Sequence, residues 1–304
     1  MRMLLKARSE KRFIEVMRAT FEQHGRTHMF RLFVDNVITT CEPANVKAIY
    51  STNFTDYDSA IRGRILRPFL GDGIFTTDGD VWQHSRAMIR PNFARGQVAN
   101  IEAIEEIFQD MLRHVPVDGT TIDLQPLFFG LTIDTSTEFL FGESVHSLRG
   151  DSAAGQKFVD AYEIGAWQCA VRASTGLLAI IKGMPREEKD AIHYCQDFVQ
   201  KFVDKALARR DTLKLSPSSQ YTFLDELVKE TADPVRLRAE VMNLLLAGRD
   251  TTASLLSNMF FQLAKRPDLW ARLREEVAPL QGAMPSFEQL KNMQLLQWCM
   301  KECM

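Results

Sequence analysis

Three absences limit the kind of protein that this sequence can encode. No apolar run reaches the roughly 18 to 20 residues that are needed to cross a bilayer. The first residues, Met1-Arg2-Met3-Leu4-Leu5-Lys6, carry charge on both sides of a very short apolar run, which argues against a secretory signal peptide. The formal net charge is only −2, so no strong field attracts nucleic acid or another anionic partner.

Cysteine and tyrosine are also scarce. The five cysteines, at 41, 169, 195, 299 and 303, are odd in number and form no Cys-x-x-Cys pair, so we expect no disulfide framework. They are expected to be small apolar side chains in a reducing compartment. Only five tyrosines stand against 20 phenylalanines. An interior rich in plain aromatic surface suits an apolar ligand, although an ordinary core explains it equally well.

Hydrophobic periodicity predicts a mainly helical chain with a small β contribution near its start. A helix from residue 13 is expected to stop at Gly25, and strands over 29–34 and 36–40 are expected to turn near Asp35-Asn36. A further helix is expected to start at Glu42-Pro43. Glycine-rich residues 71–79 should be a loop before a helix that Pro91 disturbs. The pattern then predicts helices over 96–114, 125–142, 154–175 and 186–211 and an exposed loop over 213–219.

The most informative segment is a long helix expected from Asp233 to Lys265. Asp233 can cap it and Pro234 suits its first turn, while Arg266-Pro267 closes it. Its middle is apolar on nearly all sides, which predicts that it runs through a core. The apolar residues are Val241, Met242, Leu244, Leu245, Leu246, Leu255, Leu256, Met259, Phe260 and Phe261.

Four residues inside this apolar helix are poor choices for stability: Gly248, Asp250, Thr251 and Thr252. Glycine costs about 1 kcal/mol relative to alanine in a helix. A buried carboxylate without a partner costs several kcal/mol or takes up a proton, and threonine hydroxyls compete for the carbonyls one turn back. Such a cluster indicates function. The alternative is that the glycine packs against another helix beside a threonine that bonds its own backbone.

The stretch Ala247-Gly248-Arg249-Asp250-Thr251-Thr252 resembles the oxygen-activation motif of the cytochrome P-450 family, the haem-thiolate monooxygenases. The resemblance implies that Thr251 bonds dioxygen and that Asp250 supplies protons. It also implies that Ala247 and Gly248 leave room for the haem, oxygen and substrate. A glycine lets a flat macrocycle approach the backbone closely.

A second match to the family is the pair Trp82 and Arg86, which lie four residues apart and so on one helical face. In the family, a Trp-x-x-x-Arg pair binds the haem propionates, for which the planar guanidinium is suited. The alternative is a core tryptophan with a solvated arginine. His84 between them could help at the haem edge, but a surface histidine explains it as well.

A third match, Trp298 to Met304, resembles the start of the family's Glu-x-x-Arg helix. Glu302 would be its structural glutamate, and the arginine would be the residue after Met304. We therefore expect Glu302 to be exposed at a frayed end. The sequence contains no Phe-x-x-Gly-x-Arg-x-Cys-x-Gly loop, so the haem-ligand cysteine is expected to be absent, as is the family's N-terminal membrane anchor. Cys299 and Cys303 stand in the wrong context for this role.

The resemblance implies one partial cytochrome P-450 domain over 1–304, with residues 1–60 holding a helix and strands and 61–304 being helical. The residues of these motifs are most similar to those of the fungal alkane and fatty-acid ω-hydroxylases. Such an enzyme uses haem b to insert one atom of O₂ into a C–H bond of a lipophilic substrate. Its electrons come from NADPH through NADPH-cytochrome P-450 reductase, on the cytosolic face of the endoplasmic reticulum membrane. Phe75, residues 62–69 and Leu246 are expected to line the substrate pocket.

Two alternatives of other classes remain open from the sequence. One is a fragment of such an enzyme that has no catalytic activity. The other is a helical module that binds lipophilic ligands without chemistry. Haem uptake and a carbon monoxide spectrum of the reduced protein distinguish both alternatives from an enzyme, which would show a thiolate-type Soret shift.

Overall fold

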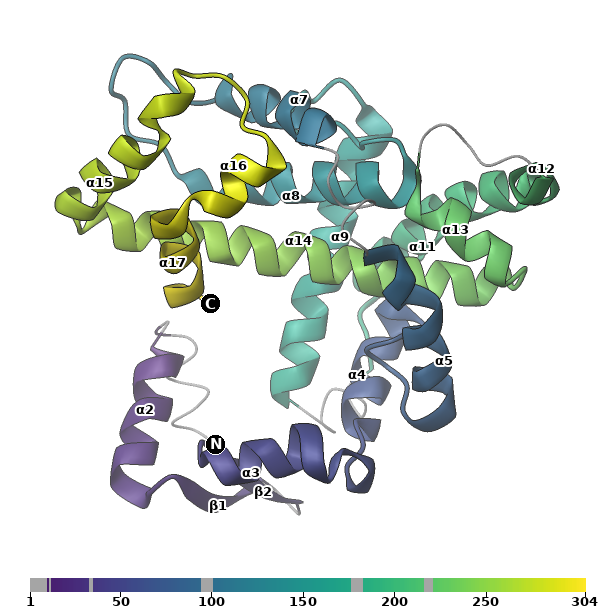
Figure 1. Cartoon of the computed structure of the whole chain (residues 1–304). Coiled ribbons are helices and arrows are strands. Elements are labelled where there is room, and N and C mark those ends of the chain that lie inside the picture. The colour runs from purple at the N-terminus through teal and green to yellow at the C-terminus, as the bar shows by residue number, and fades with distance from the viewer. Residues whose placement is uncertain (1–9, 11, 33–34, 94–100, 176–182, 216–220) are drawn as a thin grey trace. The chain divides into compact units, whose positions relative to one another are not determined.

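A computed structural model describes residues 10, 12–32, 35–93, 101–175, 183–215 and 221–304. Contacts within the chain divide it into two units, Met1–Asp58 and Ser59–Met304. Figure 1 labels the elements of both units, which are described separately below.

The first unit consists of short helices and one β-hairpin. Helix α2 (Phe13–His24) ends at Gly25, whose φ of 87° is easily adopted by glycine, as the sequence predicts. Strands β1 (Thr27–Leu32) and β2 (Asp35–Thr40) pair antiparallel. Leu32 pairs with Asp35, so β2 begins at Asp35 and the hairpin closes next to the predicted Asp35-Asn36 position. Residues 33–34 of the first predicted strand lie outside the described residues.

After the hairpin, the chain of the first unit is again helical. Pro43 occupies the first turn of α3, where the missing N–H costs nothing, as predicted from Glu42-Pro43. The elements are α3 (Pro43–Lys47), the π-helix η1 (Ala48–Thr52) and the 3₁₀ helix η2 (Phe54–Asp56).

The second unit is helical throughout its described elements. They are α4 (Ala60–Leu70), α5 (Gly79–Ile89), η3 (Arg90–Phe93), α7 (Ile101–Leu112), α8 (Leu124–Phe141), α9 (Ala153–Thr175), α11 (Arg186–Ala208), α12 (Arg210–Leu215), α13 (Phe223–Glu230), α14 (Pro234–Ala264), α15 (Pro267–Val277), η4 (Ala278–Leu280), α16 (Phe287–Asn292) and α17 (Gln294–Glu302).

Most of the predicted helices are found within a few residues of their expected bounds. Helix α5 passes into the 3₁₀ turn η3 at Pro91, where the ring disturbs the α-helix. The exposed loop predicted from Leu213 is wrong at its start. Residues up to Leu215 form α12, because the Leu213 side chain is 6% exposed and packs into the core of this unit. Residues 216–219 of that prediction lie outside the described residues.

Helix α14 has 31 residues and begins as its sequence predicts. The Asp233 carboxylate accepts hydrogen bonds from the N–H groups of Val235 (2.9 Å) and Arg236 (3.2 Å). These are two of the donors that a helix start leaves unpaired. Pro234 occupies the first turn. The length of α14 lets it contact both ends of the unit (Figure 1).

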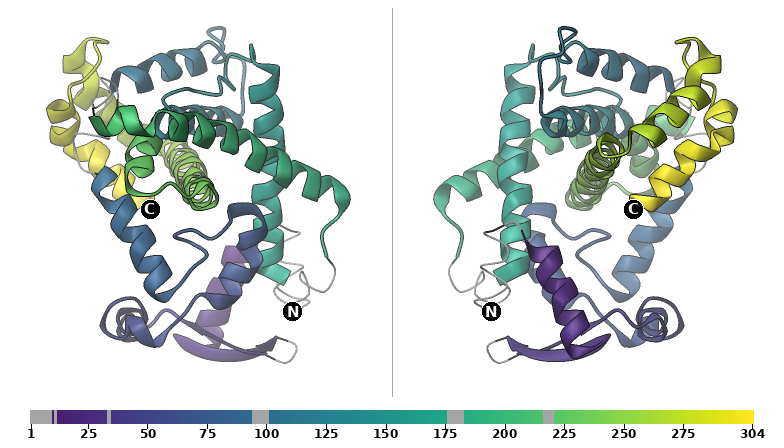
Figure 2. Two further views of the ribbon diagram at one scale, coloured as in Figure 1. Left: turned by 90° about the vertical axis from the view of Figure 1, so that its right-hand side faces the viewer. Right: turned by 90° about the vertical axis from the view of Figure 1, so that its left-hand side faces the viewer.

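Three apolar clusters of the second unit all contain side chains of α14. The first joins Val241, Met242 and Leu245 to α8, α9, α11 and α13. The second joins Ala253 to α7 and α8, and the third joins Met259 to α15 and α17. Figure 2 looks nearly along α14 and shows other helices of this unit around it. The predicted core helix is therefore confirmed, except that Phe261 is 57% exposed.

The fold class is mainly α with one small sheet near the N-terminus, as the sequence predicts. Within the described part of the chain, no helix combines the length and the apolar character that a bilayer span requires.

Candidate functional site

The predicted motif lies in the middle of α14, and its two threonines reach the surface. The Thr251 hydroxyl donates a hydrogen bond to the Ala247 carbonyl oxygen at 2.6 Å. This carbonyl lies one turn back, so the hydroxyl competes with the backbone for it. Thr251 and Thr252 are exposed, whereas the next residue, Ala253, is fully buried. The hydroxyl groups therefore face away from the apolar cluster around Ala253.

Arg249 is the buried charge of the motif, with 5% of the residue exposed. Its guanidinium carbon lies 4.3 Å from the ring centre of Phe129 and 5.4 Å from that of Tyr162. Its nitrogens contact Glu163 of α9 at 2.8 Å and Asp250 at 2.9 Å. Stacking on two rings and pairing with two carboxylates compensate for the loss of hydration. No pattern in the sequence predicts this burial.

Asp250 is neither fully buried nor unpaired, which corrects the expectation from the sequence. Its side chain is 35% exposed and its Oδ1 accepts a hydrogen bond from Arg249 at 2.9 Å. The Asp250 charge also acts on the buried Tyr162 side chain. Burial first, and the Asp250 charge second, raise the pKa of Tyr162 well above its ordinary value. Asp250 thus connects a buried polar cluster with the exposed surface beside Thr251.

Gly248 has a packing role in the structure. A Cβ atom at this position would lie 2.6 Å from the Ser136 Oγ on α8. The packing alternative therefore accounts for the glycine. It also expects a threonine that bonds its own backbone, which Thr251 does. It does not account for the paired Asp250 or for exposed threonines in a core helix. A cofactor contact at Ala247 and Gly248 stays a prediction.

A double-mutant cycle tests the packing of Gly248. In a Ser136→Ala background we expect Gly248→Ala to raise the free energy of unfolding by about 1 kcal/mol, the helix preference for alanine. With Ser136 present, the gain should shrink or reverse, because the hydroxyl must rotate away from the added Cβ. Urea unfolding of the four variants measures the coupling. Equal gains in both backgrounds would contradict the contact.

Helix α5 carries the other predicted cofactor residues. Trp82 is half-buried and Arg86 is exposed. The Arg86 guanidinium carbon lies 5.7 Å from the Trp82 ring centre, so the two side chains share one face as their spacing predicts. His84 is exposed. An indole N–H and an exposed guanidinium are the donors that carboxylate groups of a cofactor require.

The predicted substrate residues lie on three segments: residues 62–69 on α4, Phe75 in the loop before α5, and Leu246 on α14. Phe75 is half-buried in the loop before α5. Its N–H donates to the Asn243 Oδ1 at 2.9 Å, and its carbonyl accepts from the Arg62 Nε at 3.1 Å. Leu246 is half-buried and packs against the first apolar cluster. Asn243 and Arg62 were not predicted as contacts of Phe75, because no local pattern links residues so far apart.

Glu302 ends α17 and is exposed, as predicted. Cys299 is buried against α14 and α15, and burial raises the pKa of its thiol. Burial raises the pKa of Cys169 and of Cys195 to about 12 each. These three thiols are therefore protonated at neutral pH, as expected for core cysteines.

These contacts decide which part of a haem site the residues fit. The exposed Thr251 and the half-buried Asp250 on α14 suit the oxygen side of a haem, and the donor pair on α5 suits its propionates. None of the three buried cysteines offers a thiolate. Within the described residues, no group of three or more His, Cys, Asp or Glu side chains could hold a metal ion.

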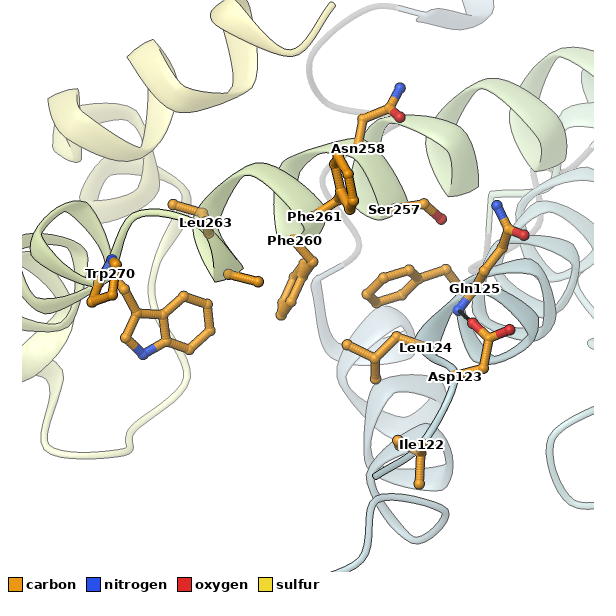
Figure 3. A pocket seen from close by; sticks show the side chains of 13 residues that line it. Ile122, Asp123, Leu124, Gln125, Ser257, Asn258, Phe260, Phe261, Leu263 and Trp270 are labelled. Carbon is orange, nitrogen blue, oxygen red and sulfur yellow. Dashed lines mark hydrogen bonds between the residues drawn. The ribbon is translucent and has the colours of Figure 1, made fainter. Parts of the chain in front are cut away.

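An apolar pocket of about 820 Å³ lies near the C-terminal end of α14 (Figure 3). Phe128, Phe260, Phe261 and Trp270 contribute rings to it. Phe261 and Trp270 are 57% and 40% exposed, so the pocket is open to the surface. None of the predicted site residues lines it.

Comparison with known proteins agrees with the fold class. The sequence model of the cytochrome P450 family matches residues 1–304. The chain therefore belongs to the cytochrome P450 family, and the resemblance drawn from its motifs is confirmed.

Named relatives make the similarity more specific. The chain is 39% identical over 298 residues to cytochrome P450 monooxygenase himC of Aspergillus japonicus, covering 96% of this chain and 54% of that protein. It is 41% identical over 299 residues to cytochrome P450 52A9 of Candida maltosa, covering 91% and 56%. It is 40% identical over 288 residues to cytochrome P450 52A12 of Debaryomyces hansenii, covering 90% and 55%. The chain spans about half the length of the curated relatives it matches.

Proposed function

We propose that the protein is a haem-dependent monooxygenase that inserts one oxygen atom of O₂ into a C–H bond of a lipophilic substrate, such as an n-alkane or a fatty acid. The observation that carries the proposal is the polar break in α14. Asp250 and the exposed Thr251 adjoin there on a helix whose neighbouring turns are buried in apolar clusters. Names of similar proteins, such as cytochrome P450 monooxygenase himC, support the reaction class.

Each residue of the proposed site has a separate task. Trp82 and Arg86 would hold the propionates of haem b, whose iron supplies the oxygen chemistry when bound. Asp250 would take protons from solvent, because its side chain is 35% exposed and hydrogen-bonded. Thr251 would pass protons on through its hydroxyl, which now donates to Ala247. Phe75 and Leu246 would form apolar walls for the substrate.

The proposal includes the partners of the reaction. Electrons would come from NADPH through NADPH-cytochrome P-450 reductase, and the protein would act at the cytosolic face of the endoplasmic reticulum membrane. The resemblance of the sequence motifs to those of the fungal alkane and fatty-acid ω-hydroxylases supports an alkane or fatty-acid substrate.

A carbon monoxide spectrum tests the proposal. The protein should be produced from its full coding sequence with haem, reduced, and exposed to carbon monoxide. We expect a thiolate-type Soret shift, followed by NADPH-dependent oxidation of dodecanoate when the reductase is added. Trp82→Ala with Arg86→Ala should weaken haem retention, whereas Arg274→Ala, at an exposed residue of α15, should not. Failure to take up haem would overturn the proposal.

A further inference from the structure

Two polar residues on the buried face of α14 have no place in the function proposed so far. Glu240 and Asn243 are three residues apart, hence on one side of the helix, and both are 0% exposed. Buried polar groups are expensive unless hydrogen bonds satisfy them. Their partners therefore indicate what they hold.

Glu240 binds two separate elements that precede it in the chain. Its Oε2 accepts a hydrogen bond from the Ile74 N–H at 3.1 Å, across 166 residues of sequence. Its Oε1 accepts a hydrogen bond from the hydroxyl of Ser85, a fully buried residue of α5. The Arg236 guanidinium lies 3.9 Å from the same oxygen and also donates to the Ser85 hydroxyl. The Glu240 carboxylate thus joins α14 to α5 and to the loop before α5 that contains Ile74 and Phe75.

Asn243 holds the next residue of the same loop. Its Oδ1 accepts from the Phe75 N–H at 2.9 Å, and its Nδ2 donates to the carbonyls of Leu70 (3.1 Å) and Ala239 (2.7 Å). Arg62 donates to the Phe75 carbonyl. Both backbone groups of Phe75 are therefore bound by side chains, one from α14 and one from α4.

The loop lies against α14 without room for a side chain between them. Gly71 has a φ of +72°, and a Cβ there would lie 2.8 Å from the Ala239 Cβ. A Cβ at Gly73 would overlap the Asn243 amide. The Thr76 hydroxyl closes the loop on itself by donating to the Gly71 carbonyl at 2.7 Å. The loop is thus shaped to the helix at two glycines.

We propose that Glu240 and Asn243 are positioning residues that hold the Phe75 loop and α5 in register with the Ala247–Thr252 motif, and so set substrate selectivity. This inference rests on the proposed function. The two side chains join the three parts of the proposed site: the apolar wall at Phe75, the Trp82–Arg86 helix and the oxygen motif. A wall that is bound at its N–H and its carbonyl keeps a pocket of defined length. A loosened wall admits substrates of several lengths.

Hydrogen exchange tests the first part of the proposal without any cofactor. In Asn243→Ala and Glu240→Ala, we expect the amides of Phe75 and Ile74 respectively to exchange about tenfold faster or more. Glu240→Gln keeps one oxygen for the Ile74 N–H and should restore most of the protection. Val241→Ala is the matched control, because Val241 is also 0% exposed on α14 but belongs to the apolar cluster. We call the hydrogen bonds from Glu240 and Asn243 to the Phe75 loop the clamp. Equal acceleration in Val241→Ala, or none in Asn243→Ala, would overturn it.

A change in the loop itself provides a second variant. Gly73→Ala leaves Glu240 and Asn243 intact but pushes the loop off the Asn243 amide. It should raise exchange at Ile74 and Phe75 as the clamp variants do. Gly25→Ala is its control, because a Cβ at Gly25 has nothing within 4 Å, whereas the backbone of Gly25, unlike that of Gly73, has a positive φ. Unchanged exchange in Gly73→Ala would contradict the close seating of the loop.

Selectivity tests the second part in the haem-loaded protein from the full coding sequence. We expect the ratio of kcat/KM for dodecanoate to that for hexadecanoate to move toward one by about threefold or more in Asn243→Ala. It should stay at the wild-type value in Val241→Ala. Faster loop exchange with an unchanged ratio would overturn the positioning role. If the wild-type protein oxidises neither acid, the fatty-acid part of the proposed function fails, while the exchange data still decide whether the clamp exists.

Discussion

Replacing Arg249 by alanine is expected to lower the free energy of unfolding by about 3 kcal/mol. The guanidinium is 5% exposed and stacks on Phe129 and Tyr162, so its removal opens a cavity between α8, α9 and α14. The loss of two ion pairs adds less, because Glu163 is 59% exposed and becomes hydrated again. Urea unfolding monitored by far-UV circular dichroism measures the change.

Two further variants separate packing from charge. Arg249→Met keeps most of the buried volume and removes the charge, so we expect it to cost only about 1 kcal/mol. Arg274→Ala removes an exposed arginine of α15 and should change stability by less than about 0.5 kcal/mol. If Arg249→Ala costs no more than Arg274→Ala, the burial of Arg249 between the two rings is wrong.

Helix α14 shows which parts of the fold can be predicted from sequence. Its start depends on Asp233 and Pro234, which act on their own first turn, and its burial follows from apolar residues on all sides. Both signals are local, so they can be read from neighbouring residues. The bounds of the hairpin strands depend on a different kind of signal. Whether Asp35 belongs to the turn or to the strand is decided by its pairing with Leu32 across the hairpin.

The contacts that organise the site are long-range and were not predictable. A glutamate at 240 and a glycine at 73 read as ordinary helix and loop residues. Only the folded chain brings the carboxylate to the Ile74 N–H and the Asn243 amide against Gly73. Arg249 was missed because arginine is almost never buried unless it is paired, and its partner Glu163 belongs to another helix.

The motif itself was found from sequence because it violates helix preferences in consecutive residues. The structure changes the reason for two of them. Gly248 is explained by Ser136 on α8, and Asp250 is stabilised by Arg249 rather than left unpaired. The Thr251 hydroxyl bonds the carbonyl one turn back, as the packing alternative expects. Its role in the reaction stays a proposal.

The largest effect on activity is expected from Asp250→Asn, which should lower kcat for dodecanoate oxidation about a hundredfold in the haem-loaded protein. Asparagine keeps an oxygen that can accept from Arg249, but it cannot take up and release a proton at neutral pH. KM should change little, because the side chain belongs to the proton path and not to the proposed apolar walls. Steady-state rates with the reductase, measured in H₂O and D₂O, check this.

Glu163→Gln is the matched control, since it also replaces a carboxylate partner of Arg249 by an amide. Both variants weaken one ion pair of the same guanidinium, but Glu163 lies on α9 outside the motif. We expect kcat to stay within about twofold of the wild type in Glu163→Gln. If both variants slow the reaction equally, Asp250 acts by orienting Arg249 and not by carrying protons. If neither variant slows the reaction, Asp250 does not carry protons. The protons must then reach Thr251 from another residue.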